Sequence, residues 1–348
     1  MRYRHVALEA LAAVVPDEVV SSAEIETRLA PVYQRLGLPE GRLELMTGIR
    51  ERRFWPQGTR PGEISVQTCE KLLAQSGFDR RAIGALVHGS VCRDQLEPAT
   101  AARVHQALGL PQSALVLDVS NACLGLLNGL LLVANMIELG QIRAGLVVGT
   151  EVGRDLVEAT IDSLLARPTV TRQDVKLAFA SLTIGSGSAA LLLTDRRLSR
   201  GGHRLLGGAF QADTAAHQLC AGGFAEQTDD QNRPLMQTDS EGLLRAGVEL
   251  AGATFGEFLD RVGWSAGDVQ RVCTHQVGRA HRRLLFDRLG LDAALDYSTV
   301  EWLGNTGAAA LPLTAALGAE AGHVRPGDRV AWLGIGSGLN SLMLGLDW

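Results

Sequence analysis

The fold is indicated first by the stretch ALVLDVSNACLGLLNGLLLVANMIEL, residues 114–139. Residues 114–119 are a short, mostly apolar run, which is typical of a buried strand. Ser120, Asn121 and Ala122 then give a short turn, and a long apolar segment starts at or just after Cys123. Glycines, asparagines and Glu138 interrupt that segment, and it is shorter than the roughly 20 residues that cross a bilayer. The stretch therefore predicts a strand, a turn and a buried helix.

The same alternation of strand-like and helix-like segments continues along the chain. Helix-like segments occupy residues 100–108, 126–139 and 242–262. Short apolar runs predict strands at residues 85–89, 144–149, 188–193, 271–274 and 330–334. This order is typical of α/β proteins, whose largely parallel sheets are covered on both faces.

A faint internal repeat suggests two copies of one unit. Residues 77–88 resemble residues 263–275, and residues 140–149 resemble residues 323–334, in the same order and at a similar separation. We therefore expect a duplicated domain. Its halves would be residues 1–198, with the candidate cysteine, and residues 199–348.

The segment that joins the halves, residues 199–237, is rich in Gly, Asp, Gln and Thr. We expect a solvated crossover loop there. Its His203, His217 and Cys220 match no metal-ligand spacing, so a metal site is disfavoured.

Composition excludes several classes of function. The 348 residues carry a net charge of −5 with a pI of about 5.9, and no block of Lys and Arg marks a nucleic-acid-binding segment. The N-terminus shows no signal-peptide pattern. The five cysteines include no CxxC pair, which disfavours a disulfide framework and a zinc site. We expect a cytoplasmic protein without a membrane span, a metal or a nucleic-acid partner.

Cys123 is the first candidate for chemistry. A thiol at the start of a buried helix meets the positive end of the helix dipole and unpaired N–H groups, so we expect its pKa to lie below the reference of about 8.5. The resulting thiolate would be a nucleophile. The alternative is a buried structural cysteine that packs as a small apolar side chain.

Two polar residues and a glycine cluster follow in an informative order. His275 comes at the end of a predicted strand, and Asn305 lies in a glycine-flanked turn. Each alone is a weak signal, but a cysteine, a histidine and an asparagine in these contexts form a nucleophile with two polar partners. The cluster GIGSG at residues 334–338 lacks the context of a phosphate loop. A turn that lends a backbone N–H to a thioester oxyanion is the better interpretation.

These motifs resemble those of thiolase-superfamily condensing enzymes of the ketoacyl-acyl-carrier-protein synthase III type. Within that group the chain is most similar to the OleA-type acyl-CoA condensing enzymes of long-chain olefin biosynthesis. The resemblance covers nearly the whole chain, through TGI at 47–49, SVCRD at 90–94, LEPAT at 96–100, DVSNACL at 118–124, HQVGR at 275–279, GNTG at 304–307 and LGIGSGLN at 333–340. It implies the α/β thiolase fold, a duplicated five-layer αβαβα arrangement with two mixed sheets. It also implies a homodimeric acyltransferase with no cofactor, coenzyme A being the carrier of the substrates.

The resemblance also implies roles for single residues. Cys123 matches the acyl-accepting nucleophile, and His275 and Asn305 match its polar partners. The backbone N–H groups of Cys123 and Ile335 would form the oxyanion hole. Glu97 matches a glutamate that OleA-type enzymes project into the partner's site as the base for the second acyl thioester.

The residues expected to bind the substrate are where this sequence departs from the family. Leu45-Met46 precedes the TGI motif where many synthase III enzymes carry an Arg and a Trp for the nucleotide of coenzyme A. Coenzyme A would then be bound by arginines within residues 50–53 or 279–283, Arg279 among them. The alternative is that these arginines only form solvated surfaces. Leu164 and Phe179 suit the lining of an acyl tunnel and suit plain core equally.

Several functions remain compatible with these residues. The first is condensation of two fatty acyl-CoAs without decarboxylation, giving a 2-alkyl-3-ketoacyl product for downstream pathway enzymes. The runner-up is a decarboxylative 3-ketoacyl synthase III that uses malonyl-acyl-carrier protein and needs no base. A thioesterase or amidase and an inactive subunit are less favoured. Glu97 separates the first two, because a donor that keeps its carbon skeleton needs a base to remove its α-proton.

Overall fold

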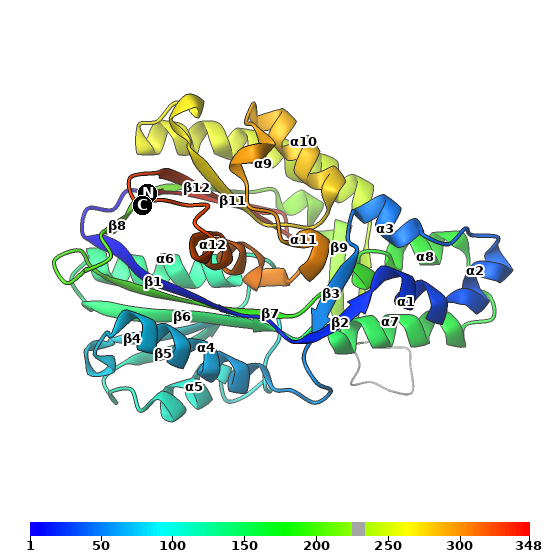
Figure 1. Ribbon diagram of the computed structural model, residues 1–348, viewed down its shortest axis with the longest axis horizontal. Coiled ribbons are helices and arrows are strands. Elements are labelled where there is room, and N and C mark those ends of the chain that lie inside the picture. The colour runs from blue at the N-terminus through cyan, green and yellow to red at the C-terminus, as the bar shows by residue number, and fades with distance from the viewer. Residues whose placement is uncertain (225–233) are drawn as a thin grey trace.

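The computed structural model describes residues 1–224 and 234–348. Nine strands of the described residues form one mixed sheet in the order β11-β12-β13-β8-β1-β7-β6-β4-β5 (Figure 1). Their bounds are β1 Val6–Val14, β4 Ala85–Gly89, β5 Leu115–Val119, β6 Ala144–Glu151, β7 Gly187–Asp195, β8 His203–Ala212, β11 Arg271–Thr274, β12 Arg329–Gly336 and β13 Asn340–Asp347. Two smaller sheets pair β2 (Glu18–Ser21) with β3 (Glu51–Phe54), and β9 (Cys220–Phe224) with β10 (Pro234–Thr238).

The helices cover and separate the two halves of this sheet. They are α1 Ser22–Arg28, α2 Ala30–Leu36, α3 Arg42–Thr47, α4 Pro61–Ser76, α5 Thr100–Leu108, α6 Gly125–Glu138, α7 Arg154–Ala166, α8 Arg172–Ala178, α9 Ser240–Val262, α10 Arg279–Leu289, α11 Val300–Leu303 and α12 Ala310–Glu320. Only two residue pairs, Ala7 with Arg204 and Leu8 with His203, join the halves between β1 and β8. The sheet therefore continues from one layer into a second.

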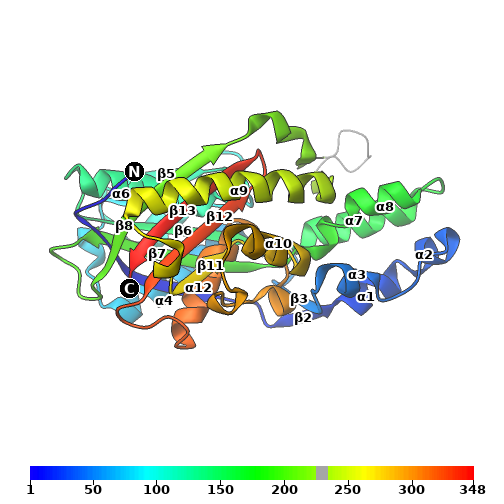
Figure 2. The same ribbon diagram turned by 90° about the horizontal axis from the view of Figure 1, so that it is seen from above.

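The layers follow from this arrangement. Helices α4 and α5 lie outside the layer of β1, β7, β6, β4 and β5, whereas α9 and α10 lie outside the layer of β8, β13, β12 and β11 (Figure 1). Helices α6 and α12 lie between the two layers. Figure 2 shows α9 lying across β13 and β12, and α1, α2, α3, α7 and α8 gathered at one end of the sheet. This is the five-layer arrangement expected from the sequence.

The internal repeat has a local structural counterpart. Gly77 caps the C-terminus of α4 and Gly263 caps that of α9, both in the left-handed region with φ of 60° and 74°, where glycine carries no steric penalty. Each helix is followed by a short 3-10 turn (Arg80–Ala82 and Ala266–Asp268) and then by a parallel strand, β4 and β11. The proposed boundary between residues 198 and 199 falls between β7 and β8, and the division into two domains stays a prediction.

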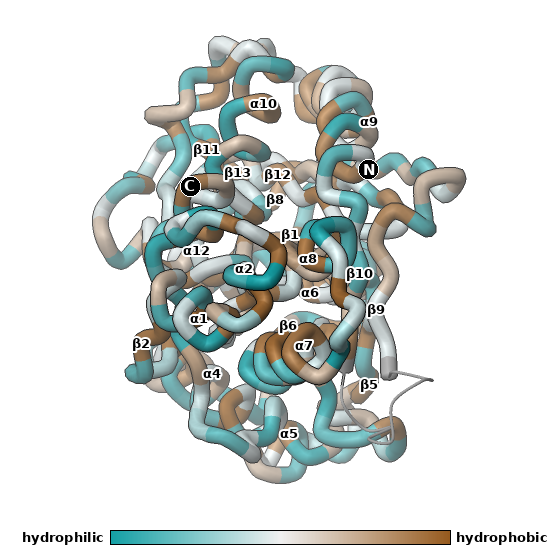
Figure 3. The backbone as a smooth tube through the Cα atoms, turned by 90° about the vertical axis from the view of Figure 1, so that its right-hand side faces the viewer, coloured by the Kyte–Doolittle hydropathy of each residue, from teal (hydrophilic) through white to brown (hydrophobic). Residues whose placement is uncertain are grey.

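The middle layer forms the largest core cluster. Leu126, Leu130 and Val133 of α6 pack in it with Trp332 of β12. A Cβ at Gly129 would lie 2.8 Å from Val147, so the glycine lets α6 approach the sheet closely. Outer helices such as α1 and α2 alternate hydrophilic and hydrophobic residues (Figure 3). Within the described ranges no helix combines the length and the apolar character needed to cross a membrane.

The prediction for residues 199–237 is wrong for much of that segment. Strand β8 lies inside the sheet and pairs with β13 from Ala212 to Arg204, and β9 and β10 form a second ladder. The His203 ring stacks on Trp348 with 4.2 Å between the ring centroids. Residues 225–233 of the segment lie outside the described residues.

Candidate active site

Cys123 lies between the sheet and the buried helix, as the sequence indicated. Strand β5 ends at Val119, and α6 begins at Gly125, two residues beyond Cys123. Ala122, directly before the cysteine, has a φ of 43°, a left-handed conformation that is rare for a residue with a side chain. Such local strain is typical of functional turns.

Close backbone packing fixes this turn. A Cβ at Gly89, the last residue of β4, would lie 2.6 Å from the carbonyl oxygen of Gly125. Two glycines therefore let the start of α6 lie against the end of β4. The position of Cys123 at the strand ends follows from this contact.

The backbone N–H groups of Cys123 itself and of Ser337 both lower the pKa of the Cys123 thiol, so they lie near its sulfur. A Cβ at Gly336 would lie 3.5 Å from the Cys123 nitrogen, so the glycine-rich turn after β12 lies directly against the nucleophile. Ile335, the donor that the family resemblance implies, lies in β12 and pairs with Ser341 of β13, and its role in the oxyanion hole stays a prediction. The N–H of Ser337, in the turn that follows, is a further candidate donor.

The resting state of the thiol differs from the expectation. The surrounding protein desolvates the thiol and raises the pKa of Cys123 to about 12, and the neighbouring Cys220 and Glu151 add to this shift. The donors from Ser337 and Cys123 oppose it without reversing it. The prediction of a lowered pKa is wrong, because loss of hydration outweighs the dipole of α6.

His275 follows β11 directly and is 4% exposed. Its backbone N–H donates to the Leu333 carbonyl of β12 at 3.1 Å, so one strand connects the histidine with the turn that holds Ser337. Burial lowers the pKa of His275 to about 3, with a smaller contribution from His281. The imidazole is therefore neutral at physiological pH.

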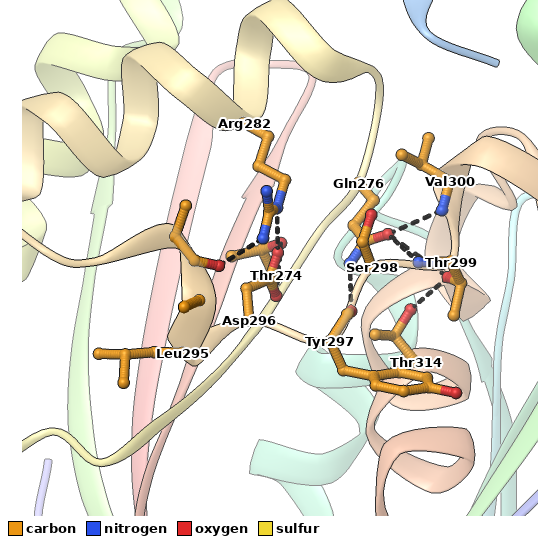
Figure 4. A network of polar contacts seen from close by, with 12 residues as sticks. Thr274, Gln276, Arg282, Leu295, Asp296, Tyr297, Ser298, Thr299, Val300 and Thr314 are labelled. Atoms are coloured by element: carbon orange, nitrogen blue, oxygen red, sulfur yellow. Dashed lines mark hydrogen bonds and ion pairs between the residues drawn. The ribbon is translucent and has the colours of Figure 1, made fainter. Parts of the chain in front are cut away.

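A polar network holds the residue before His275 (Figure 4). The Thr274 hydroxyl donates to the Asp296 carboxylate at 3.3 Å, and Arg282 Nε donates to the same carboxylate at 2.7 Å. The Asp296 side chain is fully buried and its charge is paired with Arg282. The end of β11 is thereby tied to α10.

The residue after His275 is held from the other side. Gln276 Oε1 accepts from the backbone N–H groups of Thr299 at 2.8 Å and Val300 at 3.0 Å, and Gln276 Nε2 donates to the Tyr297 carbonyl at 2.7 Å (Figure 4). These bonds cap the N-terminus of α11. Since α11 leads into the Asn305 turn, the network ties the histidine segment to the asparagine segment.

Asn305 is buried, and both its backbone and its side chain are fixed. Its N–H donates to Thr183 O at 2.9 Å, and its carbonyl accepts from Gly185 at 2.9 Å. Its side-chain Oδ1 accepts from the Gly307 N–H at 3.0 Å. Its Nδ2 group makes no hydrogen bond with the described residues, so it can donate to a substrate oxygen.

Glu97 lies in the exposed loop between β4 and α5, and it makes no hydrogen bond or ion pair with the described residues of its own chain. Its neighbour Leu96 is 81% exposed. Helix α5, which follows the loop, starts with backbone N–H groups that donate to Asp118 of β5, the last strand in the order of the sheet. A single chain thus places Cys123, Ser337, His275 and Asn305 on connected elements and leaves Glu97 at the surface.

The residues that the sequence offered as substrate contacts lie in different surroundings, some exposed and some buried. Arg279 is exposed at the start of α10 and packs on Gly48, so it is available to a ligand. Arg52 is 0% exposed and donates to the Val20 and Leu182 carbonyls, which rules out a role at the surface. Leu164 is buried in a core cluster at one end of the sheet, with Phe179 packed against it. The acyl-binding role of Leu164 and Phe179 stays a prediction.

The comparisons with known proteins agree with this geometry. The thiolase N-terminal domain model matches residues 45–157, and the 3-oxoacyl-[acyl-carrier-protein] synthase III C-terminal model matches residues 259–348. The acyl-CoA:acyl-CoA alkyltransferase of Shewanella oneidensis is 44% identical, over 100% of both chains. The protein of the same name from Xanthomonas campestris is 34% identical, also over 100% of both. This chain belongs to the acyl-CoA:acyl-CoA alkyltransferase family.

Solved structures of Xanthomonas campestris OleA support the assignment to this alkyltransferase family. One, with a glutamate replaced by glutamine, matches with a TM-score of 0.94 at 33% identity, covering 100% of this chain and 98% of that one. Another, with a cysteine replaced by serine, holds lauric acid and lauroyl-CoA; it matches with a TM-score of 0.93 at 34% identity, covering 99% and 100%. The predictions of a thiolase fold and of an acyltransferase are confirmed.

Glu151, which is the last residue of the buried strand β6 and is 5% exposed, was not among the residues predicted from the sequence. A carboxylate at the end of the otherwise apolar run AGLVVGTE was the available signal. It lies close enough to Cys123 to raise the pKa of its thiol.

The raised thiol pKa gives a testable expectation for this alkyltransferase. In substrate-free protein the rate of Cys123 alkylation by iodoacetamide should rise about tenfold per pH unit from pH 7 to pH 10, because the thiolate fraction grows in that proportion below the pKa. Peptide mass mapping after timed quenching measures the rate at Cys123 separately from the other cysteines. A plateau near pH 7 would show instead that the thiol is ionised in the resting enzyme.

Proposed function

We propose that the chain joins two fatty acyl-CoA thioesters by Claisen condensation without decarboxylation, through an acyl thioester on Cys123. The product would be a 2-alkyl-3-ketoacyl thioester. The observation that carries the proposal is a shared spacing: in Xanthomonas campestris OleA the replaced glutamate precedes the replaced cysteine by 26 residues, the separation of Glu97 and Cys123 here.

In the first half-reaction the Cys123 sulfur attacks the thioester carbon of one acyl-CoA. The bond from Cys123 sulfur to the acyl carbon forms, the bond to the coenzyme A sulfur breaks, and the thiol proton leaves with coenzyme A. The N–H groups of Cys123 and Ser337 lie near the sulfur and would stabilise the oxyanion that develops beside it. The neutral imidazole of His275 can accept and pass on the thiol proton.

In the second half-reaction a base removes an α-proton from the second acyl-CoA. The enolate oxygen would accept hydrogen bonds from Asn305 Nδ2 and from His275, and its α-carbon attacks the acyl group on Cys123. The bond to the cysteine sulfur then breaks, and the sulfur regains a proton. Glu97 is the proposed base, because a donor that loses no CO2 needs one.

Glu97 would reach that substrate only from a second copy of the chain. It has no partner among the described residues of its own chain, it lies beside the exposed Leu96, and the adjacent β5 is an unpaired edge strand. Exposed apolar residues next to an open strand edge favour association. We therefore propose a homodimer in which each protomer supplies Glu97 to the other's site.

The test is an assay with myristoyl-CoA as the sole substrate. We expect release of free coenzyme A together with a condensed product whose mass contains two acyl chains. Acylation of Cys123 that proceeds to condensation only after addition of malonyl-acyl-carrier protein would favour the decarboxylative synthase III, for which the C-terminal family model is named. Myristic acid as the only product would favour a hydrolase.

A further inference from the structure

Three backbone N–H groups converge on the buried Glu151 carboxylate. Its Oε1 accepts from Val91 at 3.0 Å and from Ala308 at 3.2 Å, and its Oε2 accepts from Cys92 at 3.2 Å. Nothing in the half-reactions above uses this side chain. A buried carboxylate with these contacts calls for an explanation, since burying a charge is costly unless it is hydrogen-bonded.

The partners of Glu151 belong to two functional segments. Val91 and Cys92 begin the loop that leads to Glu97, and Ala308 follows Gly307, whose N–H fixes the Asn305 side chain. A Cβ at Gly307 would lie 3.2 Å from the Glu151 carboxyl carbon, so only glycine leaves room for the carboxylate against the Asn305 turn. One side chain therefore joins the base loop to the enolate-binding turn.

Glu151 also acts on the nucleophile. Burial is the main cause of the raised pKa of Cys123, and Cys220 and the Glu151 carboxylate raise it further, whereas the amides of Ser337 and Cys123 lower it. Burial raises the pKa of Glu151, and hydrogen bonds from Val91, Cys92 and Ser90 oppose that rise. The carboxylate thus lies next to all three parts of the proposed mechanism.

We propose that Glu151 is a positioning residue for condensation, holding the Asn305 turn and the base of the Glu97 loop in register with Cys123. This inference rests on the proposed function. Both carboxylate oxygens are occupied by backbone donors, so Glu151 acts through the segments that it holds and does not itself exchange a proton with substrate. Only a carboxylate accepts on both sides, because glutamine would turn an N–H2 group toward the N–H of Val91 and Ala308 or of Cys92.

The experiment compares Glu151→Gln and Glu151→Asp with wild type. Glutamine keeps the shape of the side chain but removes its charge, whereas aspartate keeps the charge on a side chain that is one methylene shorter. We expect condensation of myristoyl-CoA to fall about 10²-fold in both, the usual result of a displacement of about 1 Å in a catalytic group. Single-turnover acylation of Cys123, followed by intact mass, should change by only a few fold.

The alkylation profile of Cys123 separates positioning from loss of structure. It should move to lower pH in Glu151→Gln, because removal of the negative charge lowers the thiol pKa, and it should stay in place in Glu151→Asp. Glu9→Gln is the matched control: Glu9 is also buried and also accepts from backbone amides, those of Arg200 and Gly201, but it holds the turn between β7 and β8. We expect wild-type condensation and an unshifted profile there.

Condensation at the wild-type rate in folded Glu151→Gln would overturn the inference. The inference would also be overturned if the alkylation profile of Cys123 did not shift and acylation and condensation fell equally, because that result indicates a general loss of structure. If wild type itself fails to condense acyl-CoA, the proposed function fails, and the alkylation and acylation measurements still decide whether Glu151 acts on Cys123.

Discussion

Replacing the nucleophile, Cys123→Ala, should abolish both the acyl-enzyme and the condensed product. Loss of a covalent nucleophile has cost on the order of 10⁶-fold in kcat in another enzyme that forms an acyl intermediate. The expected loss is large here because the remaining donors, Ser337 and Asn305, stabilise charge but provide no atom that can carry the acyl chain. Intact mass spectrometry after brief exposure to myristoyl-CoA should show no increment on the variant.

Cys220→Ala is the control for this experiment. Cys220 is a second thiol that raises the pKa of Cys123, and it lies partly exposed at the start of β9. The acyl increment should persist when it is replaced. If the acyl increment persisted in Cys123→Ala and disappeared in Cys220→Ala, the nucleophile would be Cys220 and not Cys123.

Local sequence pattern was sufficient to predict the bounds of several strands and helices that flank the site. Strand β4, helix α5 and strand β11 begin and end where the apolar runs and their glycine boundaries predicted. The order of Cys123, His275 and Asn305 selected three residues that the fold places on connected elements. These features depend on neighbours in sequence, so sequence alone could reveal them.

The features that sequence reasoning missed depend on contacts between distant residues. The Gly, Asp, Gln and Thr content of residues 199–237 suggested a loop, yet Gly208 of this segment lies in β8, where a Cβ would collide with the carbonyl oxygen of Met343. The thiol pKa was misjudged because Cys220, Glu151 and the desolvating surroundings come from other parts of the chain.

Glu97→Gln should separate the two half-reactions. The variant keeps Cys123, Ser337 and His275, so single-turnover acylation by myristoyl-CoA should proceed within a few fold of wild type. Condensation should fall by about 10²–10⁴-fold, the range associated with removal of a general base. Glu40→Gln, at another exposed glutamate in a loop, is the matched control and should condense normally. Condensation near the wild-type rate in Glu97→Gln would remove Glu97 from the mechanism.

Mixed dimers decide where Glu97 acts. A protomer with Cys123→Ala lacks a nucleophile but offers Glu97, and a protomer with Glu97→Gln offers a nucleophile without the base. If Glu97 crosses to the partner, each mixed dimer contains one complete site, and random pairing should restore about a quarter of the wild-type activity. If Glu97 served its own protomer, no mixed dimer would hold a complete site, so verified mixed dimers without activity would contradict the exchange. Recovery is expected because Glu97 is exposed near an open strand edge and makes no hydrogen bond or ion pair with the described residues of its own chain.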